Sequence, residues 1–473
     1  MIFMEFQWEQ IITLLIIFSV VFVIIIENRH PVKTLAWCMI LTFIPVFGVI
    51  LYILFGMNTT HRRLIKSADQ AILKGRTAEV QADEVAENVP AEQEALIGMM
   101  RNANKAFPLC GNKVEVYTDF RSMADNLVAD IENARHHVHV LFFKFENDSE
   151  GKRIADAMIR KAKEGLDVRF LYDDVANLNV SSRFYRKMKK GGVQVKSFIR
   201  ILFPILSQDY NFRNHRKLVV IDGKVGYMGG MNVAKRYAVG LKWGKWRDTH
   251  MKITGPAVSE LQTAFLTDWQ FVTHKLPSLE GLYPYNPPCG DTMMQIVTAG
   301  PLDRWNIIMQ GFMRAIAQSR RYVYIQSPYF IPTEPVLRAL QNAALGGVDV
   351  RIMIPYRGDR GVIPALASRS YVKEALEAGI NIYFYQKGYM HAKTMVCDDN
   401  FVTIGSTNFD FRSFEQDFEI NAFMYDPSLA VEYRDIFIQD QEACDKPELD
   451  SWLSRPLWER FKESFARIFS PLL

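Results

Sequence analysis

The chain has 473 residues, of which 49% are hydrophobic, 12% aromatic and 23% charged, as expected for a folded protein with two or three domains. Its net charge is only +4, which by itself gives no support to a nucleic-acid-binding protein. The five cysteines are scattered without a CxxC pair, so neither a zinc site nor a disulfide framework is predicted. A reduced catalytic part that faces the cytoplasm is the simplest interpretation.

Two uncharged apolar runs open the chain, at residues 11–26 and 34–57, with the polar turn "ENRHPVK" between them. The second run is long enough to cross the ~30 Å hydrocarbon layer as a helix, and the first is near the lower limit. No Lys or Arg precedes the first run and no small-residue cleavage site follows it, so we expect no signal peptide. We predict a transmembrane helical hairpin over residues 1–60, with a buried hairpin of a soluble domain as the alternative.

Basic residues predict the orientation of this hairpin. The turn between the runs holds Arg29 and Lys33, whereas five basic residues follow the second run: Arg62, Arg63, Lys66, Lys74 and Arg76. This excess predicts a multi-pass protein of the cell membrane with its catalytic domain in the cytoplasm. Residues 61–107 are rich in Ala, Glu and Gln and predict a helical linker.

The rest of the chain looks duplicated. "ENARHHVHVLFFKF" resembles "IAQSRRYVYIQSPYF", "EGLDVRFLYDD" resembles "GGVDVRIMIPY", and "KGGVQVKSF" resembles "EAGINIYFY", in the same order. Helices that alternate with short Val-, Ile- and Phe-rich strands favour an α/β sandwich in each half. We therefore predict an α/β fold with two halves, residues 108–285 and 286–445, in a pseudo-twofold arrangement.

Two further segments stand apart from this repeat. An insertion in the first half, residues 199–213, contains an apolar group around Pro204, which is either a core strand or a loop that faces lipid. Residues 446–473 place apolar side chains four apart among basic ones, which predicts an amphipathic helix. That helix either caps the catalytic domain or lies on an anionic membrane surface.

The same short motif occurs once in each half. The stretch "NHRKLVVIDGKVGYMGGMN" has the spacing of "MHAKTMVCDDNFVTIGSTN", so that each half holds an HxKxxxxD motif and a Gly/Asn tail. A single HxKxxxxD would be a weak signal, but two copies at the same place in a repeat are a strong one. The paired residues are His215 with His391, Lys217 with Lys393, Asp222 with Asp398, Gly229 with Gly405, Gly230 with Ser406, and Asn232 with Asn408.

The spacing of the motif predicts a single polar pocket. Alternate residues of a strand share a face, so the His and the Lys of each motif point the same way. If the twofold brings the two strand ends together, one pocket holds two imidazoles and two ammonium groups. Asn232 and Asn408 would add amide donors for substrate phosphate. Such a pocket suits an anionic phosphodiester, whose charge must be neutralised before a nucleophile approaches.

The two histidines can then divide the chemistry. One would attack phosphorus to form a phosphohistidine, and the other would act as general acid and then as general base. Each imidazole needs an acceptor that orients it, and the candidates are Asp248 and Glu419. We group Asp222 and Asp398 with the catalytic motif but expect them to hold its turn rather than touch substrate. No metal and no cofactor is predicted, because Lys217 and Lys393 would repel a cation.

These motifs resemble the phospholipase D superfamily, and the order of features is similar to the cardiolipin synthase family of bacteria. The similar stretches include "WRDTHMKITGPAV", "FDFRSFEQDFE" and the closing "SPLL". The resemblance implies transfer of a phosphatidyl group between two phosphatidylglycerol molecules, which gives cardiolipin and glycerol. It also implies that His215 is the nucleophile and His391 the general acid/base. The residues alone leave these two roles open, because the motifs are symmetric.

Several alternatives remain open at this point. Water or an amino alcohol such as serine could replace the lipid acceptor, which would make the protein a phospholipase D-type hydrolase or another phosphatidyltransferase. A membrane-tethered nuclease would need a basic groove with stacking aromatics, and a scaffold would not need both His–Lys pairs. We expect phosphatidylglycerol and cardiolipin as partners and no nucleic acid. The oligomeric state stays open, with a homo-oligomer among the options.

Overall fold

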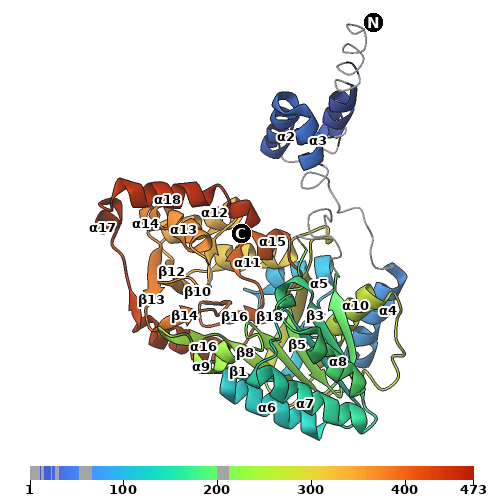
Figure 1. The fold of residues 1–473 in the computed structure, drawn as a ribbon. Helices are drawn as coiled ribbons and strands as arrows, with labels where there is room; N and C mark the ends of the chain where they lie inside the picture. Colours follow the sequence, from blue (N-terminus) through green and yellow to red (C-terminus); the bar gives the residue numbers. More distant parts are fainter. Residues whose placement is uncertain are drawn as a thin grey trace, which may run out of the picture. The chain divides into compact units, whose positions relative to one another are not determined.

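The computed structural model describes residues 11, 15–22, 24–26, 31–52, 67–199, 212–359 and 361–473. The chain divides into two compact units, Met1–Arg62 with Ile201–Asn211, and Arg63–Arg200 with Phe212–Leu473. The smaller unit carries the two apolar runs, and the larger unit carries both copies of the motif (Figure 1). Most of the insertion predicted to face lipid or the core, residues 200–211, lies outside the described residues.

The second apolar run is divided between two helices, α2 (Pro31–Phe43) and α3 (Pro45–Leu51). The helix is interrupted at Pro45, which has no N–H to donate to the preceding turn. The prediction of a single helix through residues 34–57 is therefore wrong at this position. In the part of the chain that the structure describes, no helix is both long enough and apolar enough to cross a membrane.

Within its described residues, the larger unit is built on one mixed sheet of fifteen strands. In spatial order these are β19 (Cys444–Asp445), β13 (Asn381–Tyr385), β12 (Asp349–Pro355), β10 (Tyr322–Gln326), β15 (Thr394–Cys397), β16 (Phe401–Gly405), β18 (Glu419–Met424), β9 (Thr292–Ala299), β1 (Leu109–Tyr117), β8 (His250–Thr254), β6 (Val225–Gly229), β5 (Lys217–Ile221), β2 (His137–Phe142), β3 (Asp167–Asp173) and β4 (Gln194–Phe198).

The strand order is symmetric about the pairing of β1 with β9. Outward from this pair, β8, β6, β5, β2, β3 and β4 on one side match β18, β16, β15, β10, β12 and β13 on the other. The three repeated sequence pairs fall on matching strands, namely β2 with β10, β3 with β12, and β4 with β13. The duplicated sequence thus corresponds to two halves of the same order that share one continuous sheet.

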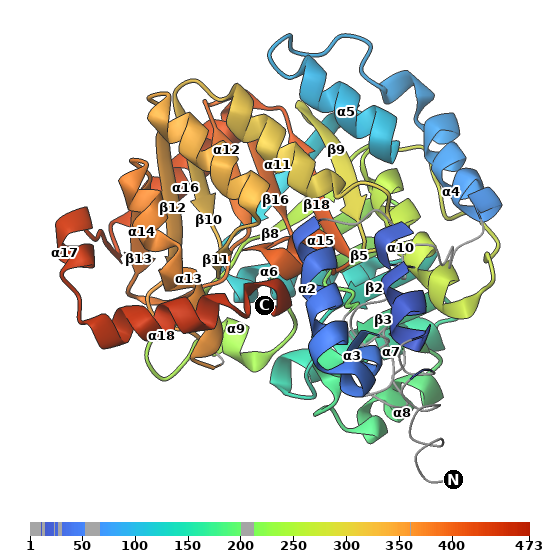
Figure 2. The same cartoon turned by 90° about the horizontal axis from the view of Figure 1, so that it is seen from above.

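Helices cover both faces of this sheet. In the first half α6 (Phe120–Asn133) and α7 (Ser149–Lys163) pack on one face and α10 (Val258–Thr273) on the other. In the second half α11 (Ile307–Gln318) and α12 (Glu334–Leu345) pack on one face and α16 (Pro427–Gln441) on the other. Figure 2 shows α11 and α12 side by side over the second half. The α/β prediction is confirmed.

The predicted linker packs against the catalytic unit along its described length. Helix α4 (Ser67–Val80) lies on α10, and α5 (Glu94–Asn104) lies on α11 and contributes Leu96, Ile97 and Met100 to a hydrophobic core. The remaining helices are η2 (Ala82–Glu84), η3 (Val175–Asn177), α8 (Ser182–Lys190), α9 (Lys235–Val239), α13 (Ile363–Ser370), α14 (Val372–Glu377), α15 (Phe411–Glu415), α17 (Leu449–Leu453), α18 (Leu457–Arg467) and η5 (Ser470–Leu472).

Candidate active site

Short strand pairings between the two halves place the motif histidines. Strand β14 (Gly388–Met390) runs parallel to β7 (Lys245–Arg247), and Asn214 forms the matching bridge with Phe418. As a result, the backbone N–H of His391 donates to Arg247 O at 2.7 Å, and that of His215 donates to Phe418 O at 2.9 Å. His391 is therefore placed beside Asp248, the residue after Arg247. His215 is likewise placed near Glu419, the residue after Phe418.

Each imidazole is bound by a carboxylate from the opposite half. His215 Nδ1 lies 2.9 Å from Glu419 Oε1, and His391 Nδ1 lies 2.6 Å from Asp248 Oδ2. The four side chains are buried or nearly so, which strengthens charge-assisted hydrogen bonds. A carboxylate that accepts from Nδ1 selects the tautomer that has its free lone pair on Nε2.

The two carboxylates are held in different ways. Glu419 Oε2 accepts the hydroxyl of Ser406, whereas Asp248 Oδ1 accepts the backbone N–H of Thr249 at 2.7 Å. The residue that matches Ser406 in the first half is Gly230, which has no side chain to donate. The two His–carboxylate pairs are therefore related by the pseudo-twofold but are chemically distinct.

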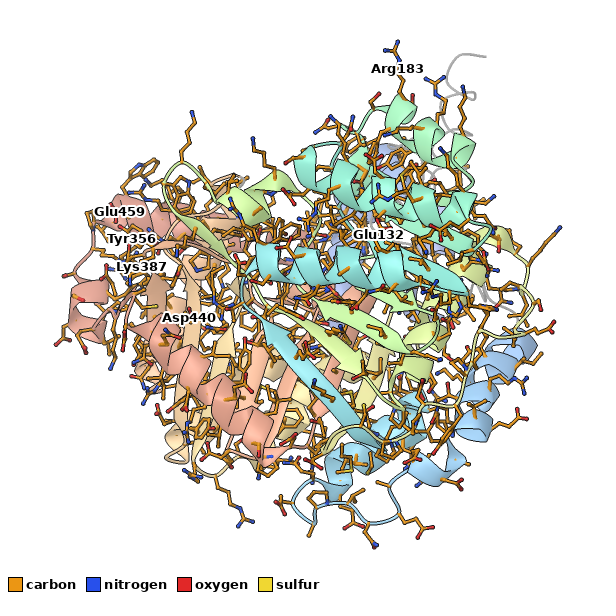
Figure 3. All side chains as sticks on the ribbon, turned by 90° about the horizontal axis from the view of Figure 1, so that it is seen from below. Glu132, Arg183, Tyr356, Lys387, Asp440 and Glu459 are labelled. Atoms are coloured by element: carbon orange, nitrogen blue, oxygen red, sulfur yellow. The ribbon has the colours of Figure 1, made fainter. Side chains whose placement is uncertain are left out.

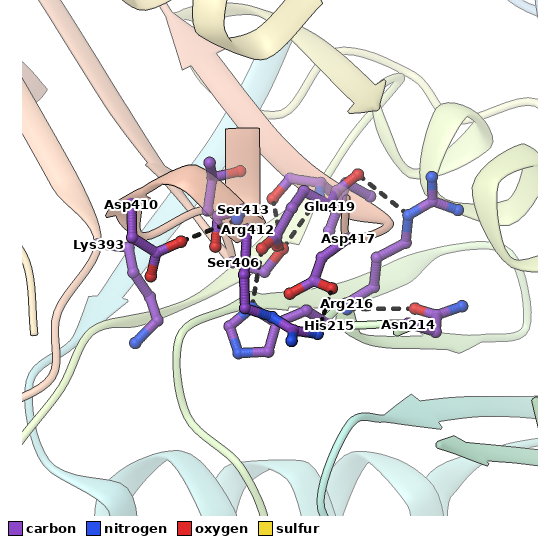
Figure 4. A network of polar contacts seen from close by, with 12 residues as sticks. Asn214, His215, Arg216, Lys393, Ser406, Asp410, Arg412, Ser413, Asp417 and Glu419 are labelled. Carbon is purple, nitrogen blue, oxygen red and sulfur yellow. Dashed lines mark hydrogen bonds and ion pairs between the residues drawn. The ribbon is translucent and has the colours of Figure 1, made fainter. Parts of the chain in front are cut away.

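Both motif lysines are buried in the same region. Lys217 is 0% and Lys393 2% exposed, and each ammonium donates to the backbone carbonyl of the histidine in its own motif. Lys393 Nζ also lies 2.8 Å from His391 Nδ1. Figure 4 shows Lys393 and His215, which come from different halves, projecting from the same network of polar contacts. The structure thus brings both His–Lys pairs into one region.

Burial and mutual repulsion lower the pKa values of the basic groups. Burial, then the charge of Lys217, lowers the pKa of His215 to about 4, and burial together with Lys393 and Lys217 lowers that of His391 well below its usual value. Burial lowers the pKa of Lys217 to about 7 and that of Lys393 to about 8, although Glu419 and Asp248 oppose this change. Without bound substrate, both imidazoles are therefore neutral near pH 7.

The two orienting carboxyls respond in opposite directions. Burial raises the pKa of Asp248, and the charge of Lys393 only partly offsets this effect. Burial would also raise the pKa of Glu419, but contacts with His215, Lys217 and Ser406 bring it below its usual value. Glu419 is thus the stronger candidate for a permanent carboxylate next to a histidine that becomes charged.

The third motif residue lies away from the imidazoles. The carboxylate of Asp222 accepts the backbone N–H groups of Arg135, His136 and His137 at 2.8–2.9 Å, where β2 begins. Asp398 does the same for Arg320, Arg321 and Tyr322 at 2.7–2.9 Å, where β10 begins. Both aspartates therefore join the motif turn to the neighbouring strand.

The two motif asparagines differ in their contacts. Asn232 Oδ1 accepts the backbone N–H of Lys144 at 3.1 Å, and Asn232 Nδ2 donates to the Tyr237 hydroxyl at 2.9 Å. Asn408 Oδ1 is buried and has no hydrogen-bond partner within the described ranges. Asn232 therefore holds the local backbone, whereas Asn408 keeps a polar atom without a protein partner.

Aromatic side chains that the sequence did not point to surround the imidazoles. The Phe143 ring meets that of His215 edge-on at 4.8 Å between centroids, and Trp246 and Tyr237 lie 5.2 and 5.8 Å from His391. From the sequence, only the spacing of Trp246, two residues before Asp248, could have indicated that an aromatic side chain lies near the imidazoles. Among the described residues, no group of three or more His, Cys, Asp or Glu side chains is placed to hold a metal ion.

Comparison with known proteins identifies the family of this chain. The family model described as "Cardiolipin synthase, PLD-like domain" matches residues 127–269 and 312–441, which contain both His–Lys pairs and both carboxylates. The chain belongs to the cardiolipin synthase family of phospholipase D-like proteins. A second family model, "Phospholipase_D-nuclease N-terminal", matches residues 11–56.

Curated relatives of the family extend over nearly the whole chain. The major cardiolipin synthase ClsA of Bacillus subtilis is 38% identical over 98% of this chain and 99% of its own length. A cardiolipin synthase of Listeria monocytogenes is 36% identical over 98% of both chains. The crystal structure of phosphatidylserine synthase from Haemophilus influenzae shares the fold, with a TM-score of 0.62 at 15% identity over 80% of this chain and 100% of that chain.

Proposed function

We propose that the protein is a cardiolipin synthase that transfers a phosphatidyl group from one phosphatidylglycerol to another and releases glycerol. The observation that carries this proposal is the pair of buried imidazoles, each bound through Nδ1 to a carboxylate of the opposite half. The full-length curated relatives support this synthase activity over hydrolysis or transfer to serine.

In this mechanism His215 Nε2 attacks the phosphorus of the first phosphatidylglycerol. A P–N bond forms and the P–O bond to the departing glycerol breaks, while His391, which takes up a proton on Nε2 when the phosphodiester anion binds beside it, gives that oxygen the proton. His391 then removes the proton from a hydroxyl of the second phosphatidylglycerol. That oxygen attacks phosphorus, breaks the P–N bond and leaves cardiolipin with a free His215.

The roles of the other groups follow from their positions. Glu419 stabilises the charge that develops on His215, and Asp248 holds His391 in the required tautomer. The ammonium groups of Lys217 and Lys393, with an amide N–H of Asn232 and of Asn408, would bind the oxygens of the phosphodiester. One phosphodiester replaces another, so the donor lipid drives the reaction and no nucleotide-linked donor is required.

Product analysis with the purified full chain tests this function. Labelled phosphatidylglycerol, with a chelator and without nucleotide, should give cardiolipin and glycerol in equal amounts, and added glycerol should reverse the reaction. His215→Ala and His391→Ala should each abolish turnover. Phosphatidic acid as the main product would make the protein a hydrolase, and a requirement for a cytidine nucleotide-linked lipid would exclude the mechanism.

The covalent intermediate has a test of its own. A His391→Ala variant lacks the acid of the first step and the base of the second, so any phosphatidyl group that slowly reaches His215 from labelled lipid should stay there. Denaturation at alkaline pH preserves the P–N bond, and peptide mapping should place the label at residue 215. Label on another residue would overturn the assignment of the nucleophile.

We also propose that residues 1–60 hold the protein in the cell membrane as a hairpin, with the catalytic unit in the cytoplasm. Large apolar side chains of α2 and the following turn are exposed, such as Phe43 at 77%, Val32 at 68% and Leu35 at 62%, which favours a lipid environment. In intact cells an Asn28→Cys variant should react with an impermeant thiol reagent. The exposed native Cys289 should react only after permeabilisation, and the reverse pattern would contradict this orientation.

A further inference from the structure

The C-terminal segment presents an apolar face to the outside. Helix α18 and the turn η5 carry six large apolar side chains with exposed fractions of 54–79%. From the second of them onward they recur every three or four residues, and all six therefore lie along one side of the helix. They are Leu457, Trp458, Phe461, Phe465, Ile468 and Leu472, called here the C-terminal apolar face. Scattered exposed apolar residues are ordinary, but a continuous row is not.

Two charged side chains of α18, Glu463 and Arg467, form contacts with the rest of the protein. Glu463 is buried and forms a double ion pair with Arg455, at 2.6 Å to Nη1 and 2.9 Å to Nη2. Arg467 pairs with Glu374 of α14 and lies over the Tyr371 ring at 4.1 Å. The helix packs on α13, and Figure 2 shows it beside α13 at the edge of the second half. These contacts fix a helix that exposes its apolar side, the reverse of an ordinary surface helix.

The aromatic part of this face is already ordered. The rings of Trp458 and Phe461 are stacked at 5.4 Å and 12°, and those of Phe461 and Phe465 at 6.4 Å and 22°. Glu459 is exposed at the first turn of the same helix and is labelled in Figure 3. The basic residues Arg460 and Lys462 flank the aromatic row. A stacked aromatic row with basic neighbours is typical of helices that lie at a lipid surface.

The same segment ends next to the candidate active site. The backbone N–H of Arg412 donates to Leu473 O at 3.3 Å, and Gln416 Nε2 donates to Pro471 O at 3.0 Å. Both donors belong to α15 and its end, directly after the motif tail at Asn408, and Arg412 pairs with Asp417 at 3.3 Å. Asp417 precedes Glu419 by two residues. The exposed row therefore ends beside α15, which follows the motif tail of the second half.

We propose that the C-terminal apolar face lies in the interfacial layer of an anionic lipid bilayer and holds the pocket at the membrane surface. This proposal rests on the proposed function, because that function places the substrate in the bilayer. Arg460 and Lys462 suit anionic headgroups, and the aromatic side chains suit the boundary between headgroups and acyl chains. A second contact with the membrane, next to the catalytic rim, would fix the height of the pocket above the lipid.

A depth measurement tests the contact without reference to turnover. In a background with Cys38, Cys110, Cys289 and Cys444 replaced by Ser, a Phe461→Cys variant of the full chain is labelled with an environment-sensitive fluorophore and placed in phosphatidylglycerol vesicles. Spin-labelled lipid in the vesicles should quench this label. The matched control is Leu345→Cys, which is 73% exposed at the end of α12 and should stay unquenched. Equal quenching at the two positions, or none at position 461, would overturn the proposal.

An activity comparison separates membrane contact from chemistry. Replacing Trp458, Phe461 and Phe465 together by Ser should lower turnover on bilayer phosphatidylglycerol about tenfold or more, because three side chains lose burial in lipid. Turnover on monomeric short-chain phosphatidylglycerol and the melting temperature should not change. The control replaces Leu178 and Leu345 by Ser. Equal loss of turnover on both substrates would indicate that the three side chains have a structural role. In the labelled Phe461→Cys protein, self-quenching that rises with protein concentration would indicate contact between copies of the chain. Either result would overturn the proposal.

If the wild-type protein makes no cardiolipin but the label at position 461 is still quenched, the proposed function fails while the membrane contact stands. If cardiolipin forms and the label is not quenched, only the membrane contact fails.

Discussion

Gly230 lies so close to Asp248 that a Cβ atom at position 230 would be 2.2 Å from Asp248 Oδ1 and 3.1 Å from Lys393 Cδ. Gly230→Ala should therefore displace the carboxylate that orients His391. We expect turnover to fall by about 10²-fold or more, the range found when a positioned proton-transfer group is lost.

The matched control for this substitution is Gly98→Ala in α5, where a Cβ atom meets nothing within 4 Å. It should leave turnover unchanged and raise stability by roughly 0.5–1 kcal/mol, since Gly is a poor helix residue. Thermal unfolding of both variants separates loss of fold from loss of alignment. A fully active Gly230→Ala protein would show that Asp248 is not needed where it lies.

Glu419→Gln should remove the charge beside His215 without changing the size of the side chain. The amide offers weaker stabilisation of a charged imidazole and can present N–H to Nδ1, which selects the wrong tautomer. We expect kcat to fall by about 10³–10⁴-fold with a smaller change in KM. Glu260→Gln is the control, because burial raises the pKa of Glu260 to about 8 and its charge is already largely lost near neutral pH. Similar kcat values for the two variants would contradict the role given to Glu419.

Asp222→Ala and Asp398→Ala should act on stability first. Each removes an acceptor for three backbone N–H groups at the start of a core strand, of which only that of His137 or Tyr322 is part-buried, so the loss should cost about 1–3 kcal/mol. We expect a lower melting temperature and, at low temperature, substantial turnover per folded molecule. Loss of turnover with an unchanged melting temperature would place these aspartates in the chemistry.

The pH profile should follow the buried lysines. A phosphodiester anion binds the ammonium forms of Lys217 and Lys393, whose pKa values are lowered to about 7 and 8. In the free enzyme kcat/KM should therefore fall as pH rises through about 7–8. On the acid side the His215 imidazole stays neutral down to about pH 4, so the acid limb should lie near that value.

Stability should move in the opposite direction at alkaline pH. Because the pKa of Lys217 is lower in the folded chain than in the unfolded chain, the unfolded chain binds more protons between about pH 7 and 10.5. The contribution of this group to stability therefore increases with pH in that window. Melting curves at pH 7 and 9 should show that lost activity is not unfolding, and a kcat/KM that stays flat to pH 9 would contradict this account.

The sequence predicted the fold class, the family and the two His–Lys pairs, because strand patterns and fixed spacings are local properties. It named both Asp248 and Glu419 but could not assign their partners. The exchange between halves depends on β14 lying beside β7 and on Asn214 meeting Phe418, which are contacts between residues far apart in the chain. The contact between Ser406 and Glu419 could not be predicted for the same reason.

Elsewhere the sequence was less informative, because single residues and long-range contacts decide features that hydropathy and spacing do not show. Hydropathy alone treated residues 34–57 as one helix, whereas Pro45 divides them in the structure. In the C-terminal segment the fourfold spacing predicted an amphipathic helix but not which side faces outward. That choice is made by the ion pair of Arg455 with Glu463 and by packing on α13.

The exchanged carboxylates also constrain how such a chain can change over evolutionary time. After a duplication, one copy can usually accumulate substitutions while the other copy keeps the function. Here a shift of register in one half would misdirect the histidine of the other, since Glu419 serves His215 and Asp248 serves His391. A substitution that moves the strands of one half must therefore be compensated by a substitution in the other half, across the axis between β1 and β9.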